Sequence, residues 1–333
     1  MNDTYEAPTV SMRAEYNTEE QTDRLADGLR TANRSLPVYQ AISAAYRCLR
    51  DQDLLATRLV FTGDMVQSVH DREDRGDRPF TMERGAGVVA AKTMPPGPDG
   101  IVDILVPTYL LGSSANDDDA DEALYWLRHV VAHEATHATL FHIGGEPFDA
   151  HKRAESGAAT MQFVLLASEL VEEHLAEYLA AENLYPGSVS TADSLRATFD
   201  AFEHTLVVDL PGVPEGDPDY FAEGMRITFE ALHIVWKTLA YLAAEVRSRH
   251  GFSAVEADIA QSEPWRKWVA PWWDEFLRLL SYIPMVTDVN VAATDRVVVD
   301  LARHLQVWAL GLGFDYHDAN GGHDAFFRIT LWD

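Results

Sequence analysis

The chain has 333 residues, of which 47% are hydrophobic and 24% are charged, so its composition is that of an ordinary globular protein. Asp and Glu number 53 against 26 Lys and Arg, and the formal net charge of −27 argues against nucleic acid or an anionic membrane as a partner. A single cysteine, Cys48, together with the lack of a signal peptide and of a membrane-spanning apolar run, predicts a soluble, cytoplasmic protein.

The first elements are predicted from hydrophobic spacing. Residues 1–33 are polar and weakly periodic, which predicts a polar N-terminal tail or an isolated helix. Apolar residues at helical spacing predict a helix within residues 36–60. Two strand-like runs follow at 85–93 and 101–111, and the Pro and Gly residues between them favour a turn. We therefore expect a small sheet in this part of the chain.

Helices dominate the rest of the sequence. Periodic apolar residues predict helices at about 119–141, 155–183, 191–209, 217–250, 264–282 and 293–311. We expect an α+β protein that is mostly helical, with a small twisted sheet beside the helix at 119–141 and a helical C-terminal half. The expected parts are a polar tail (1–33), one domain at 34–190 and a helical domain at 191–333.

The helix predicted at 119–141 contains the motif HEATH, from His133 to His137. Residues i and i+4 of a helix lie on one face, so both imidazoles would point at a single position, as a tetrahedral zinc ion requires. Glu134, one step round the helix, would act as general base on a zinc-bound water, whose pKa the metal lowers toward about 7. The alternative, two ordinary surface or hydrogen-bonded histidines, is disfavoured because apolar residues flank the motif.

A zinc site of this kind needs a third protein ligand. The long metzincin pattern is excluded, because it requires Gly and His where the chain has Leu140 and Ile143. Two further histidines, His142 and His151, remain possible ligands in principle, although neither belongs to a supporting pattern.

An acidic stripe marks the helix predicted at 155–183. Glu169, Glu173 and Glu177 fall at i, i+4 and i+8, where like charges repel one another unless a cation compensates them. Small residues beside the stripe would let a neighbouring helix approach: Ala176, Ala180 and Ala181. A carboxylate donated to zinc explains both features, whereas a solvated acidic face explains only the stripe.

The segment EHLAEYLAAENLYP, which begins at Glu173, resembles the pattern E-x-x-A-N-x-F-A-A-x-x-L-x-P of the ImmA/IrrE-like metallopeptidases. Together with the HExxH motif, the resemblance covers about residues 85–186. It implies that Glu173 is the third zinc ligand and that an edge strand precedes the catalytic helix. Glu177 resembles the outer carboxylate of thermolysin-like enzymes, which orients a metal-bound histidine through its other ring nitrogen. The chain departs from the family pattern at Glu177 and Leu179, where the family has Asn and Phe.

Peptide hydrolysis also needs a donor for the oxyanion that develops on the attacked carbonyl. The sequence offers four candidates without a spacing rule to choose among them, and for each a packing or surface role is the simpler interpretation: Tyr178, His204, Tyr220 and His233.

Two other hypotheses compete with a peptidase. In a di-iron helical-bundle oxidase or oxygenase, Glu134 and His137 would form one ExxH pair, Glu230 and His233 a second, with Glu173 between them. The strand-like runs fit such a bundle poorly. The third hypothesis is a metallopeptidase-like scaffold that binds without cleaving.

The sequence as a whole therefore predicts a zinc metallopeptidase. His133, His137 and Glu173 would hold Zn²⁺, and Glu134 would activate water for attack on a peptide carbonyl. Its expected partners are a peptide or protein substrate and, through the helical half, a regulatory protein. Residues 315–324 cluster acids and histidines and could hold a cation, although a solvated loop is the simpler interpretation.

Overall fold

The computed structural model describes residues 10–31, 36–73, 80–84, 87–112, 117–144, 150, 157–183, 192–210, 220–248, 255–283 and 290–330. The chain forms two compact units, of which the first contains residues 1–144 and 179–185 and the second the remainder. This division differs from the boundary predicted near residue 190, because the helix α6 (Ala158–Asn183) contributes residues to both units.

The first unit contains a mixed four-stranded sheet in the order β1-β2-β6-β5. The strands β1 (Ser11–Glu15), β2 (Thr57–Thr62) and β6 (Val102–Pro107) run parallel to one another. The short strand β5 (Lys92–Thr93) lies at one edge and pairs antiparallel with β6. The prediction at 101–111 is confirmed over Val102–Pro107, whereas the run predicted at 85–93 is divided: only Lys92–Thr93 join this sheet, and Gly87–Val88 pair with another strand.

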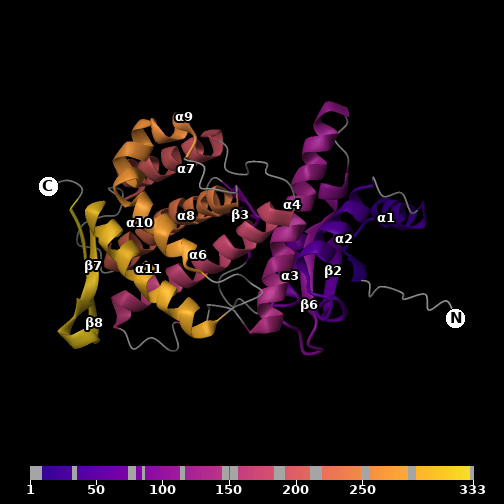
Figure 1. Cartoon of the computed structure of the whole chain (residues 1–333), viewed down its shortest axis with the longest axis horizontal. Helices are drawn as coiled ribbons and strands as arrows, with labels where there is room; N and C mark the ends of the chain where they lie inside the picture. The colour runs from indigo at the N-terminus through magenta and orange to yellow at the C-terminus, as the bar shows by residue number, and fades with distance from the viewer. Residues whose placement is uncertain are drawn as a thin grey trace. The chain divides into compact units, whose positions relative to one another are not determined.

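Alternating side chains bury both faces of the two central strands. Leu59 and Phe61 of β2 belong to the larger core cluster, whereas Val60 between them belongs to a smaller one on the opposite face. The larger cluster is built against three helices: α1 (Glu19–Thr31), α2 (Pro37–Cys48) and α4 (Asp117–Ile143). The smaller cluster includes Met65 and Val69 of α3 (Met65–His70). These layers hold α4 against the sheet (Figure 1).

Two predictions for the first sixty residues are wrong in part. Residues 11–31 are not a tail, because β1 pairs with β2 and Leu25 of α1 is buried in the core. The helix predicted within 36–60 ends at Cys48, and residues 57–62 form β2 instead. A short 3-10 turn (Leu54–Ala56) separates the helix from the strand. The prediction failed because a buried strand of a parallel sheet has a near-continuous run of apolar residues, and such a run also fits the spacing of a helix. A two-stranded ribbon, β3 (Glu83–Arg84) and β4 (Gly87–Val88), completes the strands of this unit in the described part.

The second unit is mostly helical, as predicted. Buried aromatic side chains, including Phe163, Trp236, Phe276 and Trp308, form its core. Beyond α6, its helical segments are α7 (Ala192–His204), the π-helix η4 (Thr205–Asp209), α8 (Tyr220–Ser248), α9 (Ala257–Ala260), the π-helix η5 (Trp265–Val269), α10 (Ala270–Ser281) and α11 (Val291–Gly311).

The C-terminal part of the second unit is not entirely helical. Residues 314–329 form an antiparallel hairpin of β7 (Phe314–Ala319) and β8 (Asp324–Ile329) around the short turn η7 (Asn320–Gly322). Asp318 of β7 accepts hydrogen bonds from the backbone N–H groups of Ala159 and Thr160, at 2.8 and 3.3 Å. The hairpin therefore caps the N-terminus of α6 with a carboxylate, which the helix dipole favours.

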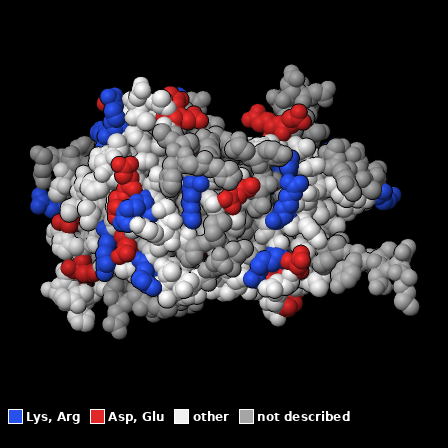
Figure 2. All heavy atoms as spheres, viewed as in Figure 1, with Lys and Arg blue, Asp and Glu red and all other residues white. Residues whose placement is uncertain are grey.

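On the face that Figure 2 shows, the described Lys and Arg side chains are scattered and do not form one continuous basic patch. Within the described ranges, no helix is both long enough and apolar enough to cross a bilayer.

Candidate metal centre

Helix α4 places the two histidines of the HExxH motif side by side. Val131, Ala132 and Ala135 are fully buried in the core, so packing fixes the rotation of the helix about its axis. The Nε2 atoms of His133 and His137 lie 3.1 Å apart, with the ring centroids 4.9 Å apart. Both Nε2 atoms thus face one position, as the i, i+4 spacing predicts.

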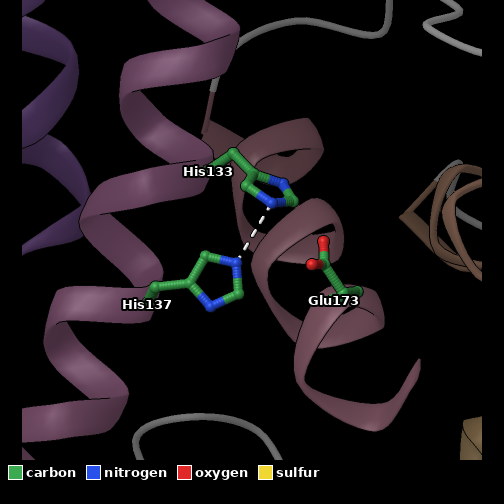
Figure 3. A group of neighbouring side chains, drawn as sticks. All are labelled: His133, His137 and Glu173. Carbon is green, nitrogen blue, oxygen red and sulfur yellow. Dashed lines mark hydrogen bonds between the residues drawn. The ribbon is translucent and has the colours of Figure 1, made fainter. Parts of the chain in front are cut away.

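Glu173 of α6 joins this pair. One ligand atom from each of His133, His137 and Glu173 lies within 4.8 Å of the other two, and the three side chains converge from α4 and α6 (Figure 3). In the described part of the chain, this is the one group of three or more His, Cys, Asp or Glu residues that could hold a metal ion.

Small residues let α6 pack closely against α4 near the C-terminal end of α6. Ala180 is fully buried and belongs to the same core cluster as Ala132, Ala135 and Ala138 of α4, so a neighbouring helix does approach there. Glu173 precedes Ala180 by seven residues, which is close to two helical turns, so the two residues share one face of α6.

The donor set fits a divalent transition metal such as zinc. Two imidazole nitrogens and one carboxylate oxygen are an established zinc ligand set that leaves the fourth position open. Ligands of a tetrahedral zinc ion lie about 3.3 Å apart, given Zn–N distances of about 2.0–2.1 Å. The 3.1 Å separation of the imidazole nitrogens is close to this value, and the ligand atom of Glu173 lies within 4.8 Å of both histidines.

Glu134 is held by the edge strand. The backbone N–H of Thr93 donates to Glu134 Oε2 at 2.6 Å, and Thr93 Oγ1 lies 2.8 Å from the same oxygen and 2.7 Å from the backbone carbonyl of Glu134. Thr93 therefore fixes one oxygen of the Glu134 carboxylate, Oε2. The sequence indicated an edge strand near the motif but did not indicate this contact.

The carboxylate of Glu173 has two partners on α8 that the sequence did not indicate. Lys237 donates from Nζ to Oε1 and Tyr241 donates from Oη to Oε2, both at 2.6 Å. The side chain of Glu173 is only 12% exposed, so these donors offset the cost of holding its charge in a largely buried position. One signal was available in the sequence, because Lys237 interrupts an otherwise apolar stretch of α8.

Glu169, which precedes Glu173 on the acidic stripe, is also compensated. His233 Nε2 lies 2.9 Å and Lys237 Nζ 3.9 Å from Glu169 Oε1. Burial acts to raise the pKa of Glu169, but the hydrogen bond with His233 and the nearby positive charge outweigh it, and the pKa is lowered overall. Positive charge from α8 therefore compensates part of the stripe, a role that the sequence had suggested only for a metal.

Glu177 is 2% exposed and follows Glu173 by one turn of α6. A carboxylate so deeply buried needs polar partners, which is compatible with its predicted role of orienting a histidine. That role stays a prediction.

The four candidate oxyanion donors lie in different surroundings. Tyr178 is buried, with the guanidinium of Arg247 4.6 Å from its ring centroid, and His204 is exposed at the end of α7. His233 lies against Glu169, and the side chain of Tyr220 is outside the described residues. The structure instead places the hydroxyl of Tyr241 on the carboxylate of Glu173.

One alternative ligand, His142, and one alternative cation site do not join the group in the described part of the chain. His142 Nε2 lies 3.0 Å from Thr57 Oγ1, and burial lowers its pKa. His151 lies outside the described residues. The segment 315–324 forms the hairpin, where Asp318 caps α6 and His317 Nδ1 lies 2.7 Å from Asp315.

The two residues of the second ExxH pair expected for a di-iron bundle, Glu230 and His233, contact different partners. Glu230 forms an ion pair with Arg226 at 2.6 Å, and its side chain is 62% exposed, whereas His233 lies against Glu169.

Comparisons with protein-family models, curated proteins and solved structures find no match to this chain. The function is therefore inferred from the geometry of the site.

Proposed function

We propose that this protein is a zinc-dependent metallopeptidase, with His133, His137 and Glu173 as the metal ligands. The observation that carries the proposal is the convergence of an imidazole pair at helical spacing and one carboxylate within 4.8 Å. The same set with Glu134 next to His133 gives the four residues that the HExxH chemistry requires.

A zinc ion bound there would supply a Lewis acid that polarises the peptide carbonyl and lowers the pKa of a water molecule. Glu134 would accept the proton of that water at Oε1, while Thr93 holds Oε2 at 2.6 Å. Glu134 would then return the proton to the leaving amine. Tyr241 would hold Glu173 through its hydroxyl group.

The edge strand supports a peptide as the substrate class. Strand β5 lies at the end of the sheet order, and its residue Thr93 contacts Glu134 directly. An extended peptide that added to this edge would bring its carbonyl groups next to the general base.

The test combines metal content with cleavage. Elemental analysis of the purified protein should give one zinc per chain, and a fluorogenic peptide library should be cleaved. Glu134→Gln should keep the zinc and lower kcat by about 100-fold or more, because it removes the general base. Two irons per chain would contradict zinc, and a zinc-loaded wild type that cleaves no peptide would favour a binding scaffold.

A further inference from the structure

Lys237 occupies an unusual position for a lysine. It stands in the apolar stretch of α8 between Trp236 and Leu239, both of which are fully buried, and its own side chain is 27% exposed. Its Nζ atom lies 2.6 Å from Glu173 Oε1 and 3.9 Å from Glu169 Oε1. The two carboxylates are one helical turn apart on α6, so a single ammonium group is placed within reach of both.

The ammonium group and a divalent cation would compete for Glu173. Each is positively charged, and each is attracted to the same carboxylate. With an ammonium group within a few ångströms, a dication at the site experiences a repulsion that grows as water is excluded. Tyr241 differs in this respect, because a neutral hydroxyl donor holds the other oxygen of Glu173 without repelling a cation.

Glu169 gives Lys237 an alternative acceptor. The ammonium lies 3.9 Å from Glu169 Oε1, and a change in the torsion angles of the flexible four-carbon stem suffices to close this distance. The pairing of Lys237 could therefore pass from Glu173 to Glu169 without leaving either charge unpaired.

We propose that Lys237 is a built-in counter-ion that competes with the metal for Glu173 and so sets the affinity of the site. It pairs with Glu173 when the metal is absent and with Glu169 when the metal is bound. The inference rests on the metal centre of the proposed function and not on peptide cleavage. In the opposite role, Lys237 would fix the position of Glu173 and so strengthen metal binding.

The sign of one affinity change separates the two roles. Zinc would be titrated into chelator-stripped, full-length protein in competition with a chromophoric chelator. Lys237→Met, which keeps an unbranched apolar stem, should bind zinc about 10- to 100-fold more tightly than the wild type, because the repulsion is removed. Lys237→Arg retains the charge and should bind no more tightly than the wild type. Equal or weaker binding by Lys237→Met would overturn the proposal.

A matched control and a double-mutant cycle complete the test. Lys267→Met removes the same charge from a lysine whose partner is Glu203, at 3.6 Å, and should leave the affinity unchanged. Glu169→Gln should weaken zinc binding in the wild type and have a smaller effect in Lys237→Met, because Glu169 acts through Lys237. An equal effect in both backgrounds would contradict the exchange.

The controls also separate this inference from the metal centre itself. If Lys237→Met fails to fold, Lys237→Gln provides the same charge change with a polar side chain. A wild type that binds no zinc would overturn the metal centre and this inference together. A wild type that binds zinc beside a Lys237 variant of unchanged affinity would overturn this inference alone.

Discussion

Thr93 and Glu134 are joined by both the main chain and the side chain of the threonine. The backbone N–H of Thr93 donates to Glu134 Oε2 at 2.6 Å, and its hydroxyl lies within 2.8 Å of the same oxygen. Both residues belong to the first compact unit, so the sheet edge and the HExxH helix together determine where the carboxylate lies. Thr93 is thus a positioning residue for the proposed general base.

Thr93→Val should lower kcat for peptide cleavage by about 10- to 100-fold, the usual effect of removing a partner that orients a reacting group. The shape of the side chain is kept, so zinc content and KM should change little. Thr93→Ser restores the hydroxyl group and should recover most of the activity. A Val variant with wild-type kcat would show that the backbone N–H alone positions Glu134.

Zinc should stabilise the folded protein. At a free zinc concentration about 100 times Kd, binding adds about 2.7 kcal/mol to the free energy of unfolding, and thermal denaturation would report this as an increase in Tm. His133→Ala and Glu173→Ala should each lose most of this increase. His70→Ala removes an exposed histidine outside the group and should retain it. If zinc raised the Tm of both ligand variants as much as that of the wild type, the proposed ligand set would be wrong.

The cap on α6 predicts opposite effects for two glycine substitutions in the second unit. A Cβ atom on Gly157 would lie 2.3 Å from Asp318 Oδ1, so Gly157→Ala should displace the carboxylate and lower the free energy of unfolding by about 1–2 kcal/mol. A Cβ atom on Gly224, within α8, would meet Phe327 at 3.6 Å, so Gly224→Ala should stabilise by about 0.5–1 kcal/mol. Urea denaturation measures both changes, and a Gly157→Ala variant with an unchanged or higher free energy of unfolding would contradict the cap.

Stability should fall on acidification because of the half-buried His304. Burial lowers the pKa of His304 below its ordinary value of 6.5, although the hydrogen bond to the Trp272 carbonyl opposes the shift. The unfolded chain therefore binds more protons, so the contribution of His304 is fully present above about pH 6.5 and is lost as the pH falls through the lowered pKa. His304→Gln should reduce the loss of unfolding free energy between pH 7.5 and 5, measured by urea denaturation. His204→Gln, at an exposed position, should leave that loss unchanged, and an equal loss in His304→Gln would contradict this account.

The histidine pair was predictable because it depends on one helix alone. Spacing within a regular helix determines which side chains share a face, so the 3.1 Å approach of His133 and His137 follows from the sequence. Glu173 needed a second inference, from the acidic stripe and from the family resemblance. The structure brings it to the pair, as expected.

The partners of the site residues were not predictable in the same way. Thr93 precedes Glu134 by 41 positions, and Lys237 follows Glu173 by 64. Such contacts depend on which face of one element packs against another, and spacing within a single element carries no information on this. The hairpin at 314–329 was missed because its acids and histidines favour a solvated loop, although residues 314–317 alternate between apolar and polar as in a strand.

Strand β1 has a practical consequence for anyone who expresses part of this protein. A clone that begins at residue 34, where composition alone suggests the first domain starts, would lack both β1 and α1. The hydrogen-bonding groups along the outer side of β2 would then be open, next to the apolar residues Leu59 and Phe61. Unprotected edges of this kind recruit other chains, so such a truncated product should collect in inclusion bodies.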